Sequence, residues 1–358
     1  MSKLIRVRAG LLRETHPGER RVALTPDDVG RLSERISFRF EPGCGVGAGH
    51  SDDGYIAAGA EPADFAEMAS SSDLFVSVRQ PIAARVFPAA AVLLFLGSFR
   101  GSKTTQVAIP PARQPLHLDI ARLSGMSGQK GADISSRQAA ITGHAAVLEA
   151  ARQFGISHPM LLADGSFVRP VKMAALGSDP ASLQALATAR RLGALTYGFG
   201  LAKDSQAKIE RLGAKFLGTS SEQELARLRQ DLSGALSKMQ LITTNIMCPG
   251  RSAPVLLNEE MLSKLSPGTV IVDLAAESGG NCALTRADET TDIFGIRIVG
   301  STTLASQEAA EASRHFSDGL RNLLEHLIDA HGALRLDGGD SVTAALLDER
   351  SPARHAWS

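Results

Sequence analysis

Short apolar runs of five or six residues recur along the first third of the chain, separated by polar segments rich in Gly, Pro, Asp and Ser. Runs of this length with such boundaries are typical of buried strands. Four of them are predicted as strands: Ile5–Ala9, Ile36–Phe40, Leu74–Val78 and Ala91–Leu96. Pro26–Leu32 is predicted as a helix, with Thr25 as its N-cap and Pro26 at the first helical position. Ser2–Leu118 is therefore expected to form one alternating α/β unit.

A second strand–helix series follows, made of Lys172–Phe216, Met239–Thr244 and Thr269–Leu274. Two long helices are predicted at its ends. Ser135–Phe154 leads into the series, and Ser306–Ala330 returns to the first unit. The apolar residues of the second helix recur at helical spacing, at Phe316, Leu320, Leu323 and Leu327.

The resulting prediction is an α/β protein of two domains that flank a cleft and are bridged by the two long helices. The expected domains are Met1–Gly131 with Thr303–Ser358, and Ala132–Thr302. The tail from His331 is rich in Gly, Asp and Arg, with a short helical pattern near Val342–Leu347, and we expect part of it to be mobile.

The second series opens on a turn that has the frame of a dinucleotide-binding unit without all of its glycines. A strand ends at Gly177, and a helix follows with apolar residues spaced to pack on a sheet. In the pattern G-x-G-x-x-G, the second glycine admits the pyrophosphate and the third admits the strand. Here those positions hold Asp179 and Ser182, and Pro180 removes one backbone N–H. Asp179 is read either as a helix N-cap, which we favour, or as a ligand residue.

Composition excludes several classes of protein. The 38 basic and 38 acidic residues among 358 balance, which argues against nucleic acid or an acidic membrane surface as a partner. No secretory signal or apolar run long enough to cross a bilayer is visible. Cys44, Cys248 and Cys282 form no paired framework, as in a reducing cytoplasm. We expect a cytoplasmic protein with no metal site, in which Cys248 and Cys282 are inert thiols.

Several segments together resemble the family of alanine dehydrogenase and the NAD(H)-binding α component of proton-translocating nicotinamide nucleotide transhydrogenase. They are collinear from Ile5 to Leu327. The matching segments are Gly18–Pro26, Ala146–Gly155, Leu183–Ala194, Glu210–Phe216, Pro249–Leu256 and Val270–Thr285. The resemblance implies two Rossmann-like domains with mainly parallel sheets, a homodimer, NAD(H) in the cleft, and hydride transfer to NADP(H) on a membrane-linked partner subunit. It implies no direct insertion into the membrane.

The resemblance also points to the transhydrogenase branch. Arg79 stands where alanine dehydrogenases carry a substrate-binding lysine, and the segment after Ala91–Leu96 lacks their catalytic histidine. Without that general acid/base, amino-acid dehydrogenation is disfavoured. Arg21 matches an arginine that grips the substrate carboxylate in alanine dehydrogenases, and a structural ion pair is an equal alternative.

The resemblance carries over only part of the NAD(H) site. Asp133 and Ser136 match the family's nicotinamide-contacting aspartate and serine, and we take them as candidate catalytic residues. Its arginine and glutamine in the same loop are Gly125 and Lys130 here. The acidic residue that accepts the adenosine ribose hydroxyls is Gly200. The mobile, tyrosine-bearing loop after Phe216 is missing.

The remaining candidates lie on two turns of the second series. A cofactor-binding role is predicted for Gly177, Ser178, Asp179, Ser182, Glu277, Gly279, Gly280 and Asn281. Asp273 and Glu277 flank a turn at the carboxyl end of a strand, where α/β proteins bind ligands, so a ligand site is favoured there. His144 is interpreted as a packed or dimer-face histidine.

Two functional interpretations stay open. The first is a transhydrogenase-like oxidoreductase with an eroded NAD site. The second is a non-catalytic relative that binds another small ligand or regulates. Because contacts are lost on every arm of the site, we expect NAD(H) to bind weakly or not at all. The double change Asp179→Gly with Gly200→Asp is expected to improve NADH affinity.

Overall fold

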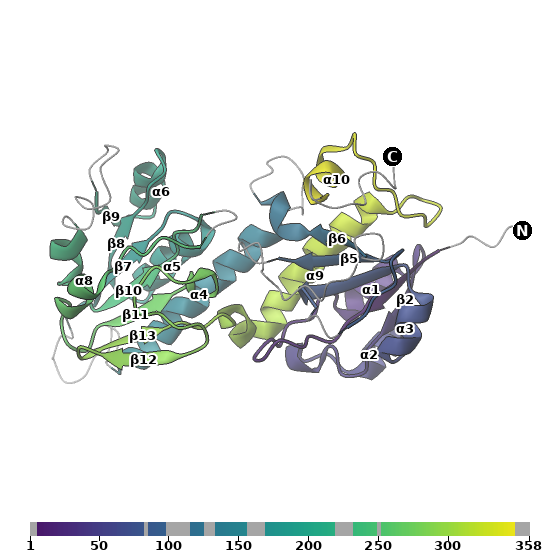
Figure 1. Cartoon of the computed structure of the whole chain (residues 1–358), viewed down its shortest axis with the longest axis horizontal. Coiled ribbons are helices and arrows are strands. Elements are labelled where there is room, and N and C mark those ends of the chain that lie inside the picture. Colours follow the sequence, from purple (N-terminus) through teal and green to yellow (C-terminus); the bar gives the residue numbers. More distant parts are fainter. Residues whose placement is uncertain are drawn as a thin grey trace, which may run out of the picture. The chain divides into compact units, whose positions relative to one another are not determined.

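The fold is taken from a computed structural model, shown in Figure 1. It describes residues 6–81, 85–97, 115–124, 133–155, 169–218, 232–248 and 252–347. The chain divides into two compact units. Unit 1 comprises Met1–Ser98, Ser102–Gln138 and Ser306–Ser358, and unit 2 comprises Phe99–Gly101 and Ala139–Ala305.

Unit 1 is built on a six-stranded parallel sheet with the strand order β3-β2-β1-β4-β5-β6. Its strands are β1 (Val7–Leu11), β2 (Ile36–Phe40), β3 (Glu61–Pro62), β4 (Leu74–Arg79), β5 (Val92–Leu96) and β6 (Leu116–Asp119). Strands β2 and β3 lie on one side of β1 and the later strands lie on the other, so the order reverses between β1 and β4. This reversal is the topological switch point of a doubly wound sheet.

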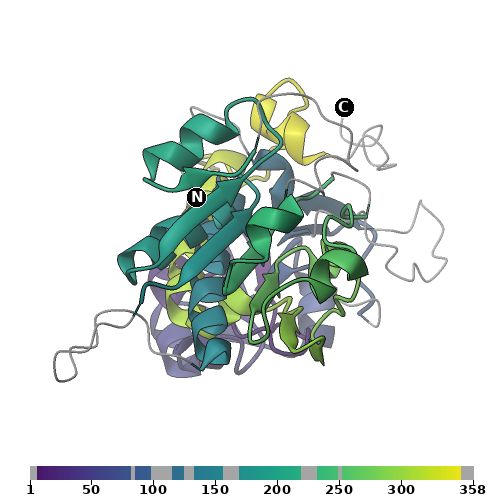
Figure 2. The same ribbon diagram turned by 90° about the vertical axis from the view of Figure 1, so that its left-hand side faces the viewer.

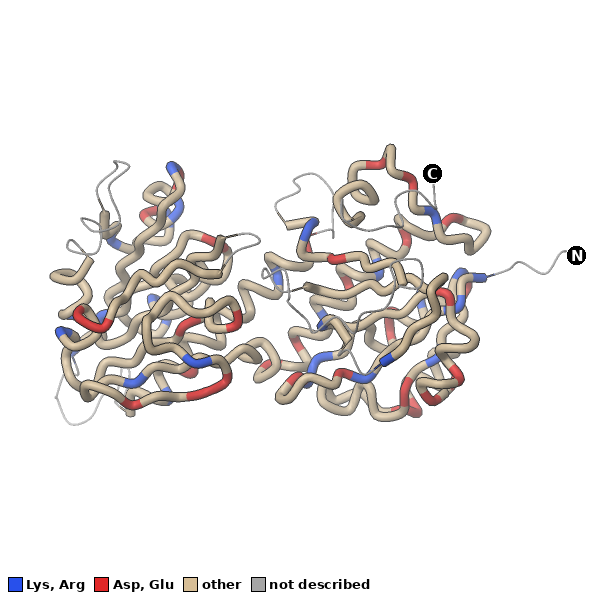
Figure 3. Tube along the Cα trace, in the orientation of Figure 1, with Lys and Arg blue, Asp and Glu red and all other residues tan. Residues whose placement is uncertain are grey.

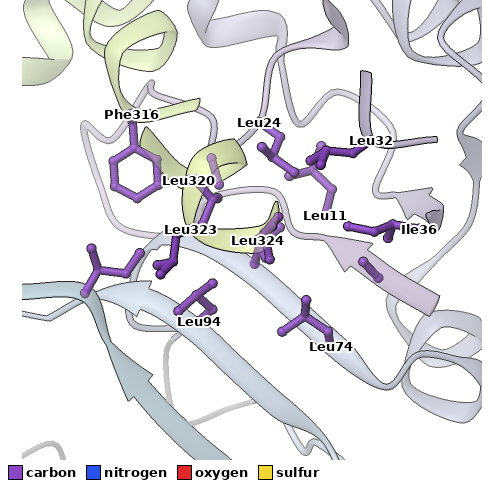
Figure 4. Close-up of a cluster of buried hydrophobic side chains, with 14 of the residues drawn as sticks. Leu11, Leu24, Leu32, Ile36, Leu74, Leu94, Phe316, Leu320, Leu323 and Leu324 are labelled. Carbon is purple, nitrogen blue, oxygen red and sulfur yellow. The ribbon is translucent and has the colours of Figure 1, made fainter. Parts of the chain in front are cut away.

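Helices cover both faces of this sheet. They are α1 (Pro26–Leu32), η1 (Val46–Ala48), α2 (Asp52–Ala57), α3 (Phe65–Ser71), η3 (Ile120–Leu123), α9 (Ala309–Leu327) and α10 (Ser341–Leu346). One face carries the main core, where α9 inserts Phe316, Leu320, Leu323 and Leu324 against β1, β4 and β5 (Figure 4). The other face packs around Phe75, Leu93 and Phe95 with Met68 of α3. Alternate residues of β4 and β5 thus point to opposite cores, as in a sheet buried on both sides.

Unit 2 is built on a seven-stranded sheet with the order β12-β13-β11-β10-β7-β8-β9. All neighbouring pairs are parallel except the hairpin β12–β13. Its strands are β7 (Lys172–Leu176), β8 (Leu195–Phe199), β9 (Lys215–Phe216), β10 (Leu241–Thr244), β11 (Val270–Asp273), β12 (Thr290–Ile293) and β13 (Ile296–Val299). The order reverses between β7 and β10, which is the switch point of this sheet.

This second sheet is also a middle layer (Figures 1 and 2). Its helices are α4 (Ile134–Phe154), α5 (Pro180–Arg191), α6 (Ser205–Arg211), α8 (Glu259–Ser263), η4 (Ala276–Ser278) and η5 (Leu304–Glu308), of which α4 and η5 begin or end in unit 1. Ala145, Val147 and Ala150 of α4 share one core with Leu186 of α5. Met261 and other residues share the opposite core with Ile242 and Ile271.

The predicted fold class, two α/β domains with mainly parallel sheets, is confirmed. Helix α1 and strand β2 have the predicted bounds, and α9 begins three residues later than predicted because Ser306–Glu308 continue the 3₁₀ turn η5. The hairpin β12–β13 was not predicted. The expected mobility of the tail falls partly on residues 348–358, which lie outside the described residues.

Charge is spread over the described chain. Basic and acidic residues alternate along the trace in Figure 3, in keeping with the balanced composition. Among the described residues, no helix is both long and apolar enough to span a membrane.

Candidate functional site

The carboxyl ends of β7 and β10 meet at the switch point of unit 2, where open α/β sheets bind their ligands. These strands are paired in parallel through Leu176 and Thr244, so the turns that leave them, at Gly177 and Asn245, start side by side. Helix α5 begins here with Asp179 as its N-cap and Pro180 in its first turn. The predicted capping role of Asp179 is therefore confirmed.

The carboxylate of Asp179 already has a complete set of partners. Its Oδ1 accepts from the backbone N–H of Ala181 at 2.9 Å and of Ser182 at 3.4 Å, and its Oδ2 accepts from Ser182 Oγ at 2.7 Å. Oδ1 also accepts from Asn245 Nδ2 at 2.8 Å. The donors that a helix N-terminus would offer to a phosphate are thus taken by a side chain of the same chain.

Gly177 is required by this turn. Its φ of 146° is one that residues with a side chain rarely adopt, and a Cβ there would lie 2.8 Å from Asn245 O and against Ser182 Oγ. The first glycine of the pattern is therefore kept for backbone reasons. Ser182, at the third position, is buried at 1% exposure, and its hydroxyl serves Asp179.

A second closure lies at the carboxyl end of β8. Ser178 Oγ and Ser205 Oγ are 2.7 Å apart and share a hydrogen bond between the turn after β7 and the start of α6. A Cβ on Gly200 would lie 2.5 Å from Ser205 Oγ and 2.8 Å from Ser178 Cβ. An aspartate cannot be placed at position 200 without moving both serines. The double change Asp179→Gly with Gly200→Asp is therefore insufficient to rebuild a ribose acceptor, contrary to our expectation.

The turn after β11 is organised by Asp273, which is fully buried. One oxygen accepts from Thr244 Oγ1 and Ala275 N–H, and the other from the N–H groups of Asn281 and Cys282 and from Thr285 Oγ1. A buried carboxylate with five donors is satisfied without a ligand.

Asn281 and Gly280, predicted as cofactor residues, are instead part of this internal network. The side chain of Asn281 accepts from Ile246 N–H at 2.8 Å and donates to Ile246 O and Pro254 O. Gly280 has a φ of 84°, and a Cβ there would lie 2.8 Å from Asp273 Oδ2. Both residues therefore hold the loops after β10 and β11 together. Of this group, Glu277 and Gly279 are the exposed ones at the edge.

Asp133 and Ser136 belong to unit 1, whereas the predicted cofactor residues belong to unit 2. Asp133 Oδ1 accepts from Ser136 N–H at 3.0 Å, which is the geometry of a cap at the start of α4. Gly125, Lys130 and the segment after Phe216 from residue 219 lie outside the described residues.

Arg21 forms a structural ion pair, one of the two alternatives for this residue. Its Nε and Nη2 donate to Glu19 Oε1 and Oε2 at 2.7 and 2.6 Å, and its Nη1 donates to Gln138 Oε1 at 2.8 Å. Burial opposes ionisation of Glu19, but the hydrogen bonds and charge of Arg21 lower the pKa of this carboxyl to about 2.

Glu14 was not predicted, although it follows the strand that ends at Leu11. Its carboxylate accepts from the backbone N–H groups of Val78 and Arg79 at the end of β4. An acidic residue just after a buried strand is the sequence signal that could have found it.

The remaining predictions concern histidine, cysteine and metals. His144 Nδ1 lies 3.1 Å from Thr188 Oγ1 and joins α4 to α5, as the packed interpretation predicts. Burial raises the pKa of the Cys282 thiol, which keeps it protonated and unreactive. Over the described ranges, no cluster of His, Cys, Asp and Glu is arranged to hold a metal ion.

Fold and sequence comparisons agree on the class of protein. Residues 10–115 match the N-terminal domain of the alanine dehydrogenase/PNT family, and residues 146–348 match its C-terminal domain. The chain belongs to this family.

Within the family, the chain is transhydrogenase α-subunit-like. It is 31% identical over 347 residues to a chain of NAD(P) transhydrogenase subunit alpha from Rhodospirillum rubrum, covering 88% of this chain and 89% of the relative. A transhydrogenase structure from Sinorhizobium meliloti matches with a TM-score of 0.86 and 29% identity, over 95% of this chain and 97% of that one. Alanine dehydrogenase of Mycobacterium tuberculosis is 27% identical over 288 residues, 76% of this chain and 74% of the relative. An L-alanine dehydrogenase structure, at 21% identity and a TM-score of 0.80, shares the fold over 96% of both chains.

Proposed function

We propose that this protein is a transhydrogenase α-subunit-like binding or regulatory component in which the dinucleotide site of unit 2 no longer binds NAD(H). The observation that supports this proposal is the Asp179 carboxylate, which is held by α5 and by Asn245 at the switch point. A pyrophosphate at this place would meet a like charge and would have to displace four hydrogen bonds.

The energetic argument has two components. A helix N-terminus favours an anion by about 0.3–1 kcal/mol, and here Asp179 already receives that stabilisation. A ribose acceptor contributes on the order of 1.5–3 kcal/mol for each charge-assisted hydrogen bond, and Gly200 supplies none. These two losses together correspond to roughly several hundredfold in dissociation constant.

Calorimetric titration of the full chain with NADH and then NADPH tests the proposal. We expect no saturable binding of NADH below about 1 mM, a range in which binding free energies are weaker than about 4 kcal/mol. Binding of NADH at low micromolar concentration to the unmodified chain would show that the proposal is wrong.

Variants separate the two closures of the site. Asp179→Gly uncovers the N–H groups of α5 and is expected to bind NADH measurably. Adding Gly200→Asp together with Ser178→Gly and Ser205→Gly makes room for the ribose acceptor and is expected to tighten binding by a further tenfold or more, about 1.4 kcal/mol.

The matched control is Asp64→Gly. Asp64 caps α3 in unit 1 in the same way, accepting from Glu67 N–H at 2.8 Å, but it is not at a switch point. This variant loses an N-cap carboxylate and is expected to gain no NADH binding. A gain in both variants would point to general loosening of the chain.

Retained hydride transfer is the second candidate function. It is favoured by Asp133 and Ser136, which keep the positions and the local geometry expected of nicotinamide-contacting residues. A hydride-transfer assay between NADH and oxidised NADP analogues distinguishes the two. Turnover that is lost in Asp133→Asn, with the fold unchanged, would favour the oxidoreductase.

The proposal includes a cytoplasmic homodimer formed largely through unit 2, and a membrane-bound partner subunit. The partner is suggested by the similarity to relatives named as transhydrogenase subunits. The dimer is suggested by the small residues of α4 and by Leu148, which is 40% exposed on that helix.

A further inference from the structure

The loop that follows β1 is attached to the end of β4 at the switch point of unit 1. Leu12 N–H donates to Val76 O at 3.1 Å. Two residues further on, Glu14 Oε1 accepts from Val78 N–H at 2.6 Å and Oε2 accepts from Arg79 N–H at 3.2 Å. One side chain thus takes both N–H groups that β4 would otherwise present beyond the sheet.

A third attachment lies next to Glu14. His16 Nε2 donates to Gln80 O at 2.9 Å, so the loop follows the last residues of β4 for its whole length. Arg13 N–H donates to Glu41, which pairs with Arg85. These contacts position the loop but do not touch the Glu14 carboxyl group.

The charges that face Glu14 come from the same loop. The Glu19 carboxylate raises the pKa of Glu14 and the Arg21 guanidinium lowers it. Because Arg21 is bound in a bidentate pair to Glu19, it provides little compensation for a second carboxylate. Glu14 is therefore a carboxyl group without a counter-ion of its own.

Burial of this carboxyl group has the largest effect and, against the lowering by the Val78 N–H, raises its pKa to about 7. When the loop opens, the carboxyl group is hydrated and its pKa returns to the ordinary value of about 4.5. The closed loop then binds more protons than the open one between these two values. Closing is stabilised fully below about pH 4.5, and this contribution is lost as pH rises through 7.

We propose that Glu14 is a proton-binding site that holds the loop after β1 closed on the end of β4, so that opening the loop releases one proton. This inference goes beyond the proposed function and does not depend on whether unit 2 binds a nucleotide. Its ligand is the proton, and its effect is to make access to the carboxyl edge of β1 and β4 easier as pH rises.

Hydrogen exchange of the full chain tests the inference. The protection factors of the Val78 and Arg79 amides, which divide out the intrinsic pH dependence of exchange, are measured from about pH 5 to 8. We expect protection to fall by up to about tenfold per pH unit between pH 5 and 7 and to level off above. Protection that does not change with pH would overturn the proposal.

Two variants assign the effect to one residue. Glu14→Gln keeps the shape of the side chain but cannot titrate, and its protection is expected to be independent of pH. His16→Gln removes the neighbouring titratable group and is expected to keep the slope of the unmodified chain. The same slope in Glu14→Gln, or its loss in His16→Gln, would overturn the proposal.

Infrared spectroscopy provides a readout that does not need a folded Glu14 variant. In chain labelled with ¹³C at glutamate carboxyl groups, a carboxylic-acid band is expected at pH 6 and is expected to disappear as pH rises through about 7. Absence of that band at pH 6 contradicts a bound proton at Glu14.

Discussion

At the residue scale, this chain uses carboxylates at the ends of its strands as acceptors for its own backbone. Asp119 at the end of β6 accepts from the N–H groups of Gly97 and Ala121. Asp179, Asp273 and Glu14 do the same after β7, β11 and β1. Because parallel sheets bind ligands at this edge, each such carboxylate occupies donors that a bound anion would need.

Asp179→Ala is predicted to destabilise unit 2 by about 1–2 kcal/mol, since it removes an N-cap and leaves Asn245 Nδ2 and Ser182 Oγ without their acceptor. Asp179→Asn keeps the capping oxygen, and we expect it to stay within a few tenths of a kcal/mol of the unmodified chain. Urea unfolding of both variants measures the difference. Equal stability of the two would mean that the cap contributes nothing.

At the element scale, α10 depends on its N-terminal contacts. Asp340 accepts from Thr343 N–H and Oγ1 at 2.8 and 2.9 Å and lies 2.9 Å from His326 Nε2 at the end of α9. The hydrogen bond from His326 lowers the pKa of Asp340 to about 2. Val342 and Leu346 then bury the helix in the core of unit 1.

Asp340→Ala is predicted to speed hydrogen exchange of the α10 amides about fivefold at neutral pH, as expected for loss of an N-cap worth about 1 kcal/mol. His326→Ala removes only the contact with α9 and is expected to have less than half that effect on a logarithmic scale. Exchange that is equally fast in both variants would assign the stability to the contact with His326 and not to the cap.

Local patterns predicted the elements that are bounded by local signals. Helix α1 has Thr25 and Pro26 at its start, and β2 is a short apolar run. The hairpin β12–β13 carries no such signal. Its first strand is exposed or partly exposed, and its turn is Phe294–Gly295, in which Phe294 takes a φ of 53° that usually favours Asn or Gly.

The candidate site was predictable only where its contacts are local. Asp179 precedes a helix at the turn, so its capping role follows from neighbouring residues. Asn245 and Ser205 lie 66 and 27 residues away from the groups they bind, and only the order of the strands brings them there. Asn281 was predicted from close backbone approach at a strand end, but its burial depends on loops from two strands.

At the scale of the whole molecule, the family and the two doubly wound sheets define the protein, and the proposed dimer is the assembly to test. Leu148 is the most exposed apolar side chain of α4 in unit 2, whereas Val46, 65% exposed, belongs to unit 1.

Sedimentation velocity at micromolar concentration is predicted to show a dimer. Leu148→Lys is expected to shift it toward monomer, because a buried charge at an interface costs several kcal/mol. Val46→Lys changes an apolar side chain of unit 1 in the same way and is expected to leave the dimer intact. A monomer in the unmodified chain would contradict the proposed assembly.

The hydrogen bond from Asn245 to Asp179 also affects how the protein responds to the cell around it. A protein whose switch point is joined by a bound nucleotide gains stability that grows with the logarithm of nucleotide concentration. Here β7 and β10 are joined at that point by the polypeptide itself. The melting temperature of this chain should therefore stay constant while the cellular ratio and amount of nicotinamide nucleotides change, so that its abundance is uncoupled from the redox state.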